Sequence, residues 1–349
     1  MKIEQIKSFD NHKMVLFFND DKLSLRGFIA IHSIFNKLSL GATRFCEYKS
    51  EIDALNDVLK LSKNMTYKCA VSDIKYGGAK AVIIKKEKSY KSIDFLKKYA
   101  FFVNSLNGLF KTGADVGIFE EDIKILKKYS KHIIDDYSKN DPSYWTAVGI
   151  FYAIKSSLNF VFKNDLFIDK TFAIKGVGKV GFNLLKLILE HKGNVIVSDK
   201  NDNLIKKIKK TFPTVKIVDH KNIHKEKVDV YSPCALSNEF TEKNIKDLNC
   251  KIICGGANNQ LENEVIGELI FKKGIIYVPD YLSNSGGLIS VVSTYENKSK
   301  KFLLNKIKKI YNKVYNLLNL SIEEGIPTNI ILKEKVLDFI ENNNKYINI

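Results

Sequence analysis

The sequence predicts an α/β protein of two domains. The chain has 349 residues, a length that fits one large or two ordinary domains, and 45 % of them are hydrophobic. From about Thr171 onward, short apolar strands alternate with helices, which is typical of βαβ crossovers in a mostly parallel sheet. The part before Thr171 begins with strands and continues with amphipathic helices. We expect one domain over residues 1–139, a second over 140–325 and a helical C-terminal segment over 326–349.

In the first half, runs of β-forming residues predict strands over 15–18 and 23–31. A helix is expected to start at Ser50, because Ser50 with Asp53 three residues later resembles a capping box. Apolar residues at helical spacing predict two further helices, over 92–107 and 120–131. This half therefore combines a sheet with covering helices.

In the second half, short apolar runs predict six strands. They cover 172–175, 195–198, 215–218, 228–231, 251–254 and 275–278. A helix over 140–162 is expected to join the two halves, with the domain boundary near Lys139. After residue 288 the chain is expected to be helical through residue 320, and a glycine and a proline separate that helix from a last one over 330–340.

The composition limits the class of protein. The net charge is +17, but arginine occurs only at Arg26 and Arg44, and the lysines are spread along the chain, so a solvated surface is favoured over a nucleic-acid site. No apolar run approaches the roughly 18 residues that span a bilayer, and no signal-peptide core is present. The five cysteines form no CxxC pair. We therefore expect a cytoplasmic protein with reduced thiols, no bound metal, and neither nucleic acid nor membrane as a partner.

A glycine-rich turn follows the first strand of the second half. Gly176, Gly178 and Gly181 form GxGxxG directly after 172–175. The first glycine allows a tight turn, the second lets a pyrophosphate approach the backbone, and the third lets helix and strand pack closely. Asp199 ends the next strand, where a carboxylate can bind ribose hydroxyls and repel the 2′-phosphate of NADP. The pattern predicts a Rossmann-type domain that binds NAD; the alternative is a similar turn that binds nothing. The candidate cofactor residues are Gly176, Gly178, Lys179, Val180, Gly181 and Asp199.

Two lysines stand where a charge is unexpected. Lys68 follows Met65 by three residues, so it shares the apolar face of the predicted helix. Lys80 follows a predicted turn of small residues, 77–79, and leads into an expected strand over 81–84. A substrate could lie against this turn, and confinement of the ammonium would lower the pKa of Lys80 toward that of a general base. The alternative is that the aliphatic part of Lys68 is buried while its ammonium reaches solvent, and that Lys80 lies at a solvated strand end.

Asp115 is a lone carboxylate between two glycines, and by itself the sequence around it favours an ordinary turn over a catalytic acid. It belongs, however, to a set of short stretches that run along nearly the whole chain. They are 40–44 (LGATR), 65–68 (MTYK), 77–80 (GGAK), 112–117 (TGADVG), 176–181 (GVGKVG), 256–260 (GANNQ), 279–281 (PDY) and 284–287 (NSGG). Read together, in order and at consistent spacing, they resemble the Glu/Leu/Phe/Val amino-acid dehydrogenase family, in its leucine and phenylalanine dehydrogenase branch.

The resemblance implies an enzyme that oxidatively deaminates an L-amino acid to a 2-oxo acid and ammonia, with NAD as the hydride acceptor. In that case Lys68 and Asn259 bind the α-carboxylate. Lys80 is the general base for the attacking water, and Asp115 relays protons to and from the amino group. The positions that match further cofactor contacts are Thr146, at the nicotinamide amide, and Asn258.

The resemblance also bears on the substrate. The positions that match the substrate pocket are Leu40, Gly41, Met65, Gly113, Leu288 and Val291. The glutamate branch has a lysine at position 40 that can pair with the side-chain carboxylate, so Leu40 favours an apolar substrate. Gly113 and Leu288 resemble the phenylalanine form of the pocket, whereas the leucine form has alanine and valine there. The sequence thus favours an aromatic or mixed apolar substrate over leucine.

The fold that the resemblance implies has an N-terminal catalytic and oligomerisation domain, a Rossmann-type NAD domain, and a C-terminal helix that returns to the first domain. A homo-oligomer is expected, since N-terminal strands can pair across subunits. Ala42, Tyr144 and Trp145 depart from the family pattern. Two other functions stay open: a divergent Rossmann dehydrogenase acting on another small acid, and a basic nucleic-acid-binding protein on the same scaffold.

Overall fold

The structure is a computed structural model that describes residues 3–86, 90–135, 141–235 and 239–341. It divides into two compact units. The first is Met1–Asn140 with Thr294–Glu296, and the second is Asp141–Ser293 with Asn297–Ile349. The predicted boundary at Lys139 and the predicted helix start at residue 140 lie outside the described residues.

The first unit is built on a mixed five-stranded sheet with the strand order β1-β2-β4-β3-β5. Its strands are β1 (Met14–Asp20), β2 (Leu25–Ile31), β3 (Ser39–Cys46), β4 (Gly77–Ile84) and β5 (Phe110–Ala114). β2 pairs antiparallel with β1 and β4, whereas β3 lies between β4 and β5 and is parallel to both. β1 and β5 are therefore the edges of this sheet.

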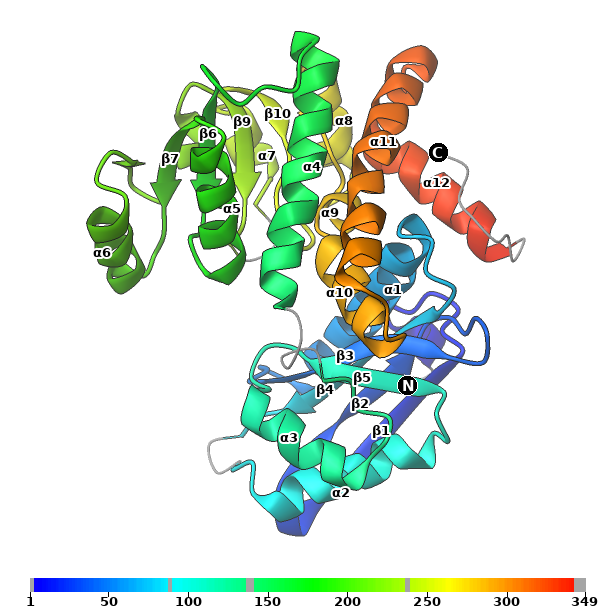
Figure 1. Ribbon diagram of the computed structural model, residues 1–349. Coiled ribbons are helices and arrows are strands. Elements are labelled where there is room, and N and C mark those ends of the chain that lie inside the picture. The colour runs from blue at the N-terminus through cyan, green and yellow to red at the C-terminus, as the bar shows by residue number, and fades with distance from the viewer. Residues whose placement is uncertain (1–2, 87–89, 136–140, 236–238, 342–349) are drawn as a thin grey trace. The chain divides into compact units, whose positions relative to one another are not determined.

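Helices cover both faces of this sheet (Figure 1). α1 (Glu51–Val71) lies on one face, and α2 (Ile93–Ser105) and α3 (Glu120–Tyr129) lie on the other; the short 3-10 helices are η1 (Ile3–Gln5) and η2 (Asp21–Leu23). Side chains alternate along β4, so Val82 packs with residues of α1, whereas Ala81 and Ile83 pack with residues of α2. The Ser50 hydroxyl accepts a hydrogen bond from the N–H of Asp53 at 3.1 Å, which confirms the predicted start of α1.

Two parts of this sheet differ from the sequence prediction. β3 and β5 are not predicted, because small and charged residues interrupt the apolar alternation that indicates a strand. The glycines of 77–79, predicted to form a turn, lie inside β4. A Cβ atom on Gly78 would lie 2.0 Å from the backbone nitrogen of Thr66, so glycine is needed where α1 packs directly on the strand.

The second unit contains a parallel six-stranded sheet with the order β11-β10-β9-β6-β7-β8. Its strands are β6 (Thr171–Lys175), β7 (Asn194–Ser198), β8 (Lys216–Ile217), β9 (Val228–Pro233), β10 (Cys250–Ile253) and β11 (Ile276–Tyr277). All six overlap the predicted ranges. The strand order reverses between β6 and β9, and the carboxyl ends of strands at such a switch point are where open α/β sheets bind ligands. The predicted fold class, two α/β domains with a Rossmann-type second sheet, is confirmed.

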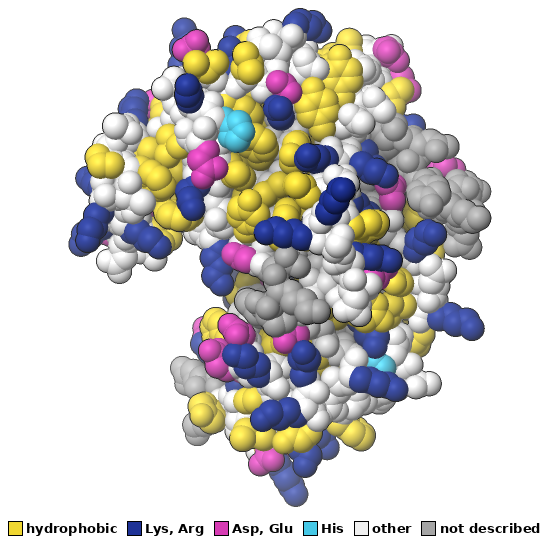
Figure 2. Space-filling view, in the orientation of Figure 1, with side chains coloured by type: hydrophobic (Ala, Val, Ile, Leu, Met, Phe, Trp, Pro, Cys, Tyr) yellow, Lys and Arg dark blue, Asp and Glu magenta, His cyan; other side chains and the backbone are white. Residues whose placement is uncertain are grey.

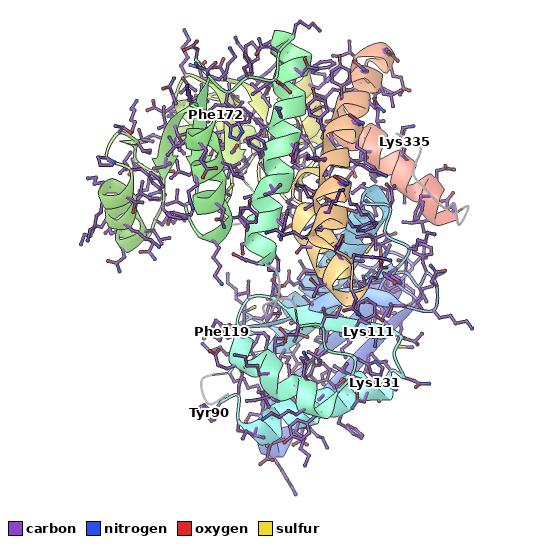
Figure 3. All side chains as sticks on the ribbon, in the orientation of Figure 1. Tyr90, Lys111, Phe119, Lys131, Phe172 and Lys335 are labelled. Carbon is purple, nitrogen blue, oxygen red and sulfur yellow. The ribbon has the colours of Figure 1, made fainter. Side chains whose placement is uncertain are left out.

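Helices also lie on both faces of this second sheet (Figure 1). The helices after residue 140 are α4 (Pro142–Phe162), α5 (Lys179–Glu190), α6 (Asp202–Thr211), η3 (Ile223–Lys225), α7 (Glu242–Ile245), α8 (Glu264–Lys272), α9 (Asp280–Ser283), α10 (Gly286–Tyr295), α11 (Lys300–Glu324) and α12 (Thr328–Glu341). Phe172 on β6, labelled in Figure 3, stacks on Phe167, whose ring also stacks on Phe151 of α4. The next residue, Ala173, belongs to the core formed with α7 and α8 on the other face.

The predicted helix over 288–320 is interrupted. α10 ends at Tyr295 and α11 starts at Lys300, because the hydroxyl of Ser299 caps α11 by accepting the N–H of Phe302 at 3.2 Å. At its other end, α11 stops at Gly325, whose φ of +67° is the left-handed conformation that glycine adopts at low cost. The segment is thus a series of capped helices rather than one.

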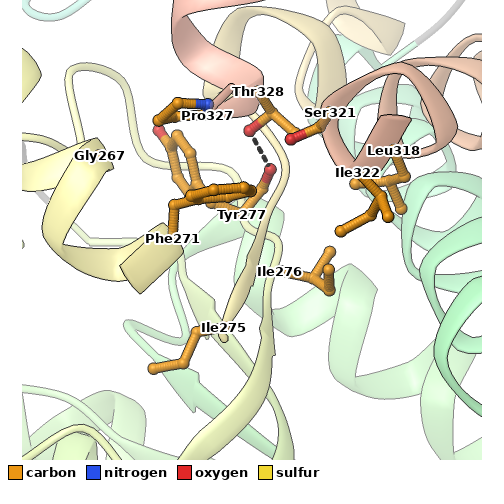
Figure 4. Close-up of a pocket in the computed structure, with 10 residues that line it drawn as sticks. All are labelled: Gly267, Phe271, Ile275, Ile276, Tyr277, Leu318, Ser321, Ile322, Pro327 and Thr328. Carbon is orange, nitrogen blue, oxygen red and sulfur yellow. Dashed lines mark hydrogen bonds between the residues drawn. The ribbon is translucent and has the colours of Figure 1, made fainter. Parts of the chain in front are cut away.

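α12 belongs to the second unit, where it packs with α8 and α11 around a pocket of about 10 Å³ (Figure 4). Beside this pocket the hydroxyl of Thr328 donates to the carbonyl of Tyr277 at 2.6 Å. Such a volume holds about one water molecule, so the pocket is a packing feature rather than a substrate site. The expected packing of 326–349 on the first domain stays a prediction, and 342–349 lies outside the described residues.

The surface carries many lysines. Figure 2 shows Lys and Arg side chains spread between acidic and apolar groups over the visible face, the dispersed pattern that the sequence predicts. Within the described residues, no helix is both long and apolar enough to cross a membrane. All five cysteines are free thiols.

Candidate active site

An ion pair lies on the α1 face of the first sheet. Nζ of Lys80 on β4 lies 2.6 Å from Oδ2 of Asp115, the residue that follows β5. Arg44 on β3 donates from Nε to the same oxygen at 3.0 Å. The Lys80 side chain is only 8 % exposed, so Lys80 does not lie at a solvated strand end. Three neighbouring strands thus bring two cations and one carboxylate together.

The two cations determine the protonation state of Asp115. Burial by itself raises the pKa of this carboxyl, but the positive charges of Lys80 and Arg44 outweigh burial and hold the pKa well below its usual range. Asp115 is therefore an ionised hydrogen-bond acceptor at neutral pH. A proton can pass between Lys80 and Asp115 without any backbone movement, because their polar atoms are already in contact.

Arg44 is a site residue that the sequence analysis includes in a motif without giving it a role. Its Nη1 donates to Oδ2 of Asp57 on α1 at 2.9 Å, and the hydroxyl of Tyr48 donates to the same oxygen at 2.6 Å. Arg44 therefore joins α1 to Asp115. One feature of the sequence could have identified it, namely that arginine is rare in a chain whose basic residues are almost all lysine. An arginine has several N–H donors and can bind two carboxylates at once. Nothing local in the sequence pairs it with Asp57.

The α1 face of the sheet also carries predicted substrate residues. Leu40 on β3 is paired with Lys111 on β5, and Gly113 lies two residues further along β5, on the same face as Lys111. Leu40 is 1 % exposed. A Cβ atom on Gly113 would meet only the carbonyl oxygen of Ile134, at an ordinary contact distance of 3.5 Å. The space beside Gly113 therefore admits a methyl group without a clash.

Gly41 has a different environment from its neighbour Leu40. A Cβ atom on Gly41 would lie 2.0 Å from the carbonyl oxygen of Ala79 on β4. No side chain fits at this position, so Gly41 can act only through its backbone. Its predicted place near the substrate stays a prediction.

Helix α1 carries Met65 and Lys68 three residues apart, and both are half-buried. Thr66, between them, shares hydrogen bonds with Nδ1 of His32 at 2.9 Å and with the hydroxyl of Ser33 at 2.7 Å. Both partners follow β2, so these bonds fix the turn of α1 that carries the predicted carboxylate-binding lysine.

The glycine turn of the second unit has three different glycine environments. Gly176 has a φ of +94°, which side chains rarely adopt. A Cβ atom on Gly181 would lie 1.9 Å from the carbonyl oxygen of Gly176, whereas one on Gly178 would have no atom within 4 Å. The turn therefore has free space beside Gly178 and none beside Gly181. This geometry suits a pyrophosphate at the start of α5, where unpaired N–H groups attract anions.

Asp199, at the end of β7, is held against this turn. Its Oδ2 accepts the N–H of Val177 at 2.8 Å, and its Oδ1 accepts the N–H of Asn201 at 2.8 Å. On the first turn of α5, Lys179 is exposed and Val180 is half-buried. The carboxylate is thus fixed in place beside the predicted phosphate position.

Two predicted asparagines lie in the loop after β10. Asn259 has a left-handed backbone with φ of +52°, and its N–H donates to Oδ2 of Asp280 at 2.9 Å. The side-chain oxygen of Asn258 accepts from Nδ2 of Asn284 at 3.0 Å. The motif residues around 280 and 284 therefore hold the loop that presents both asparagines.

The other predicted residues of the second unit lie on α4 and α10. The hydroxyl of Thr146 donates to the carbonyl of Pro142 at 2.8 Å. A Cβ atom on Gly287 would lie 2.4 Å from that hydroxyl, so the start of α10 packs closely on α4. Leu288 and Val291 follow on α10 and are half-buried.

The predicted residues thus fall into two groups, one in each unit. In the first, the structure brings Lys80 and Asp115 into contact. In the second, it brings Asp199 into contact with the glycine turn. In the part of the chain that the structure describes, no three His, Cys, Asp or Glu side chains converge as metal ligands.

Comparisons with known proteins agree along the chain. Residues 12–139 match the family described as Glu/Leu/Phe/Val dehydrogenase, dimerisation domain, and residues 139–323 match Glutamate/Leucine/Phenylalanine/Valine dehydrogenase. Phenylalanine dehydrogenase from Lysinibacillus sphaericus is 37 % identical over 326 residues, covering 91 % of this chain and 86 % of that protein. Leucine dehydrogenase from Bacillus subtilis is 33 % identical and covers 91 % and 88 %.

L-tryptophan dehydrogenase from Nostoc punctiforme is similar in both sequence and structure. The sequences are 35 % identical over 336 residues, covering 96 % of this chain and 95 % of that protein. A crystal structure of that enzyme covers 95 % of this chain and 96 % of its own, with a TM-score of 0.81 at 34 % identity. A glutamate dehydrogenase from Thermus thermophilus has a TM-score of 0.77 at 15 % identity over 96 % of this chain and 89 % of its own, which is a likeness of fold alone.

Proposed function

The chain belongs to the Glutamate/Leucine/Phenylalanine/Valine dehydrogenase family, and on that basis we propose that it catalyses the reversible, NAD-dependent oxidative deamination of an apolar L-amino acid. It is an amino-acid dehydrogenase of the branch that contains the phenylalanine, leucine and tryptophan enzymes. The products are the 2-oxo acid and ammonia. The finer assignment, to an aromatic or mixed apolar substrate, is supported by Leu40, Gly113 and Leu288.

The observation that carries the proposal is the contact between Lys80 and Asp115 at 2.6 Å. An amino acid must lose one proton from its ammonium group before its Cα can lose a hydride, and an ionised Asp115 is an acceptor for that proton. A water molecule must then be deprotonated to attack the iminium carbon. Lys80 can accept that proton in its neutral form, once its own proton has passed to solvent.

We assign the α-carboxylate of the substrate to Lys68 and Asn259, because a buried carboxylate needs paired donors. The attachment of Thr66 to His32 and Ser33 supports this role, since it restrains the helical turn that carries Lys68. The side chain of Met65 contributes apolar surface beside this group. After water attack, the Lys80 ammonium stabilises the oxygen of the tetrahedral adduct, and Asp115 returns a proton to the departing ammonia.

The family uses a nicotinamide dinucleotide, and the residues present fit one. The open space beside Gly178 leaves room for a pyrophosphate, and the left-handed Gly176 keeps the turn tight. When bound, the nicotinamide supplies the acceptor for the Cα hydride. Asp199 would accept hydrogen bonds from the hydroxyls of the adenosine ribose. Because its negative charge would repel a 2′-phosphate, it supports NAD over NADP as the cofactor. Thr146 and Asn258 are our candidates for further contacts to the cofactor.

The first unit matches a dimerisation domain, so the chain forms a homo-oligomer. We propose that an edge of its sheet takes part in assembly. β1 is an edge strand, and it exposes Phe17 and Met14. An exposed edge strand with apolar side chains is a surface that proteins usually cover.

The proposal is tested by following NADH absorbance with purified protein, NAD and a panel of L-amino acids: Phe, Trp, Tyr, Leu, Val and Glu. We expect turnover with one or more apolar members. Lys80→Ala should lower kcat by roughly 10³-fold or more, because it removes the general base, while NAD binding stays nearly unchanged.

Lys85→Ala is the matched control, since Lys85 follows the same strand and pairs with exposed Glu47. It should retain normal turnover. A near-normal rate in Lys80→Ala would overturn the base assignment, and no turnover across the panel by a folded protein that still binds NAD would overturn the proposed reaction.

A further inference from the structure

Lys111 on β5 is a cation that the mechanism above does not use. Its Nζ lies 2.8 Å from Nδ1 of His132 and donates to the carbonyl oxygen of Lys131 at 3.3 Å. The ring of Tyr295 lies 5.8 Å from it, a cation–π distance. All four residues belong to the first unit, and Figure 3 labels Lys111 and Lys131.

Three other partly buried lysines, unlike Lys111, each have an anionic partner. Lys80 pairs with Asp115, Lys91 pairs with Asp122, and Lys175 pairs with Glu239. Lys111 forms no ion pair among the described residues. Its pKa is lowered, mainly by burial and to a smaller extent by the positive charge of Lys131. A half-buried ammonium without a carboxylate is a place where an oxygen of a ligand would be stabilised.

The hydrogen bonds of Lys111 leave one donor available. An ammonium has three N–H groups, and two of them have acceptors, the ring of His132 and the carbonyl of Lys131. His132 is 7 % exposed, and burial together with Lys111 and Lys131 lowers its pKa, so its ring is neutral and its Nδ1 can accept. Among the described residues, the third N–H has no oxygen or nitrogen acceptor, and the ring of Tyr295 is its neighbour.

Lys111 lies on the same face of the sheet as the proposed catalytic carboxylate Asp115. Lys111 and Gly113 lie at alternate positions along β5, and Asp115 continues this alternation just after the strand; Leu40 lies directly across from Lys111. At about 3.3 Å per residue, Lys111 is about 6.6 Å from Gly113 and about 13 Å from Asp115. A substrate whose amino group meets Asp115 and whose ring lies over Gly113 therefore extends toward Lys111.

We propose that Lys111 is a specificity-determining residue that donates a hydrogen bond to an oxygen at the far end of the substrate's side chain. Among aromatic amino acids the ligand of this chemistry is L-tyrosine, whose phenol oxygen accepts a hydrogen bond. The ring then lies over Gly113, and Lys111 binds its tip. This inference rests on the proposed function, since it concerns the substrate of that reaction.

The experiment compares kcat/KM for L-tyrosine, 4-methyl-L-phenylalanine and L-phenylalanine, with NAD, in wild type and Lys111→Met. The methyl compound matches the size of tyrosine at the ring tip but has no oxygen. We expect wild type to prefer tyrosine to the methyl compound. Lys111→Met should lower kcat/KM for tyrosine by at least about tenfold, the usual effect of one hydrogen bond to a charged group, and change the other two by less than about threefold.

Two further variants separate specificity from structure. Lys131→Met removes a neighbouring exposed cation and should leave the preference for tyrosine intact. Lys111→Arg keeps an N–H donor and should retain more of that preference than Lys111→Met. If Lys111→Met does not fold, Lys111→Arg against Lys131→Met still measures whether the identity of the donor changes the tyrosine preference.

The outcomes are distinct. If wild type turns over the panel but Lys111→Met changes all three substrates by one factor, or none of them, Lys111 is structural and this inference alone fails. A wild type without preference for tyrosine over the methyl compound also overturns it. If wild type oxidises no amino acid at all, the proposed function fails and this inference fails with it.

Discussion

The glycine turn of the second unit and the charged cluster of the first unit are built in opposite ways. The turn uses residues within one short stretch, 176–181, and its shape follows from backbone space that only glycine leaves. The cluster uses Arg44, Lys80 and Asp115 from three strands, and its shape follows from charge pairing. The first is a local property of the chain, whereas the second exists only after β3, β4 and β5 have paired.

The two regions should therefore fail in different ways. The turn should be sensitive to the volume of a single added carbon and insensitive to pH. The cluster should be sensitive to loss of charge and to acid, because it depends on an ionised Asp115. Single substitutions in each region separate these two kinds of dependence.

Gly181→Ala should have the largest effect. Its Cβ would lie 1.9 Å from the carbonyl oxygen of Gly176, so β6 and α5 must move apart. We expect a loss of roughly 1–3 kcal/mol in the free energy of unfolding, together with loss of NAD binding. Urea unfolding and a fluorescence titration with NADH measure the two effects.

Gly178→Ala is the matched control, since an added Cβ there has no neighbour within 4 Å. Stability should change by less than about 0.5 kcal/mol, while NADH affinity falls by about tenfold or more. Equal destabilisation by both alanines would show that the two positions do not differ in the space they leave for a Cβ atom.

Asp199→Ala should lower the affinity for NAD by roughly tenfold to a hundredfold, because it removes hydrogen bonds to a charged acceptor. Affinity for NADP should fall less or rise, since the repulsion of the 2′-phosphate is also removed. Calorimetric titration with both dinucleotides measures the ratio. Asp202→Ala, an exposed change of the same charge on α6, should leave the ratio unaltered, and an unaltered ratio in Asp199→Ala would refute the ribose assignment.

Gly113→Ala should change the substrate preference by about tenfold at constant stability. The new methyl group meets only the carbonyl oxygen of Ile134 at 3.5 Å, so the fold accepts it, but it occupies space beside the expected substrate ring. One methyl group is worth about 1–3 kcal/mol of discrimination. The ratio of kcat/KM for phenylalanine and leucine should fall, and an unchanged ratio would mean that the ring does not lie there.

Arg44→Gln should have the smallest effect, a decrease in unfolding temperature. Unlike the effects of the other substitutions, this decrease should depend on pH. The pKa of Asp115 is lowered on folding, so the stability that it contributes is present above the unfolded carboxyl pKa of about 3.9 and is lost as the pH falls through the folded pKa. The difference in unfolding temperature between wild type and Arg44→Gln should therefore be largest near pH 7 and should shrink below about pH 4.

The other arginine of the chain provides the control. Arg26 pairs with Glu51, whose side chain is 53 % exposed, and such pairs contribute little to stability. Arg26→Gln should change the unfolding temperature only slightly at either pH. A pH-independent loss in Arg44→Gln would mean that Arg44 acts through packing rather than through the charge of Asp115.

The predictability of the fold follows the same division. All six strands of the second sheet are predicted, because each is a short apolar run bounded by turn residues. β3 and β5 are not, because Arg44, Gly41 and Gly113 interrupt the apolar pattern. β4 is predicted only from residue 81, since glycines that indicate a turn in isolation serve close packing of α1 here.

The candidate site divides in the same way. Asp115 is found from the sequence only through the family resemblance, whereas the small residues before Lys80 already single out that lysine. No short-range rule pairs the two, because one lies on β4 and the other follows β5. The contact between them and the role of Arg44 appear only in the structure. Lys111 is found only there too, since its lack of an anionic partner depends on what the fold places around it.

By itself, the sequence determined the α/β class, the parallel second sheet and the glycine turn, because strand length, helical periodicity and glycine conformation act over a few residues. The tertiary structure alone decided which charges meet. Residues far apart in the chain come together only after strand order and register are set, and burial then converts their proximity into the protonation state of Asp115.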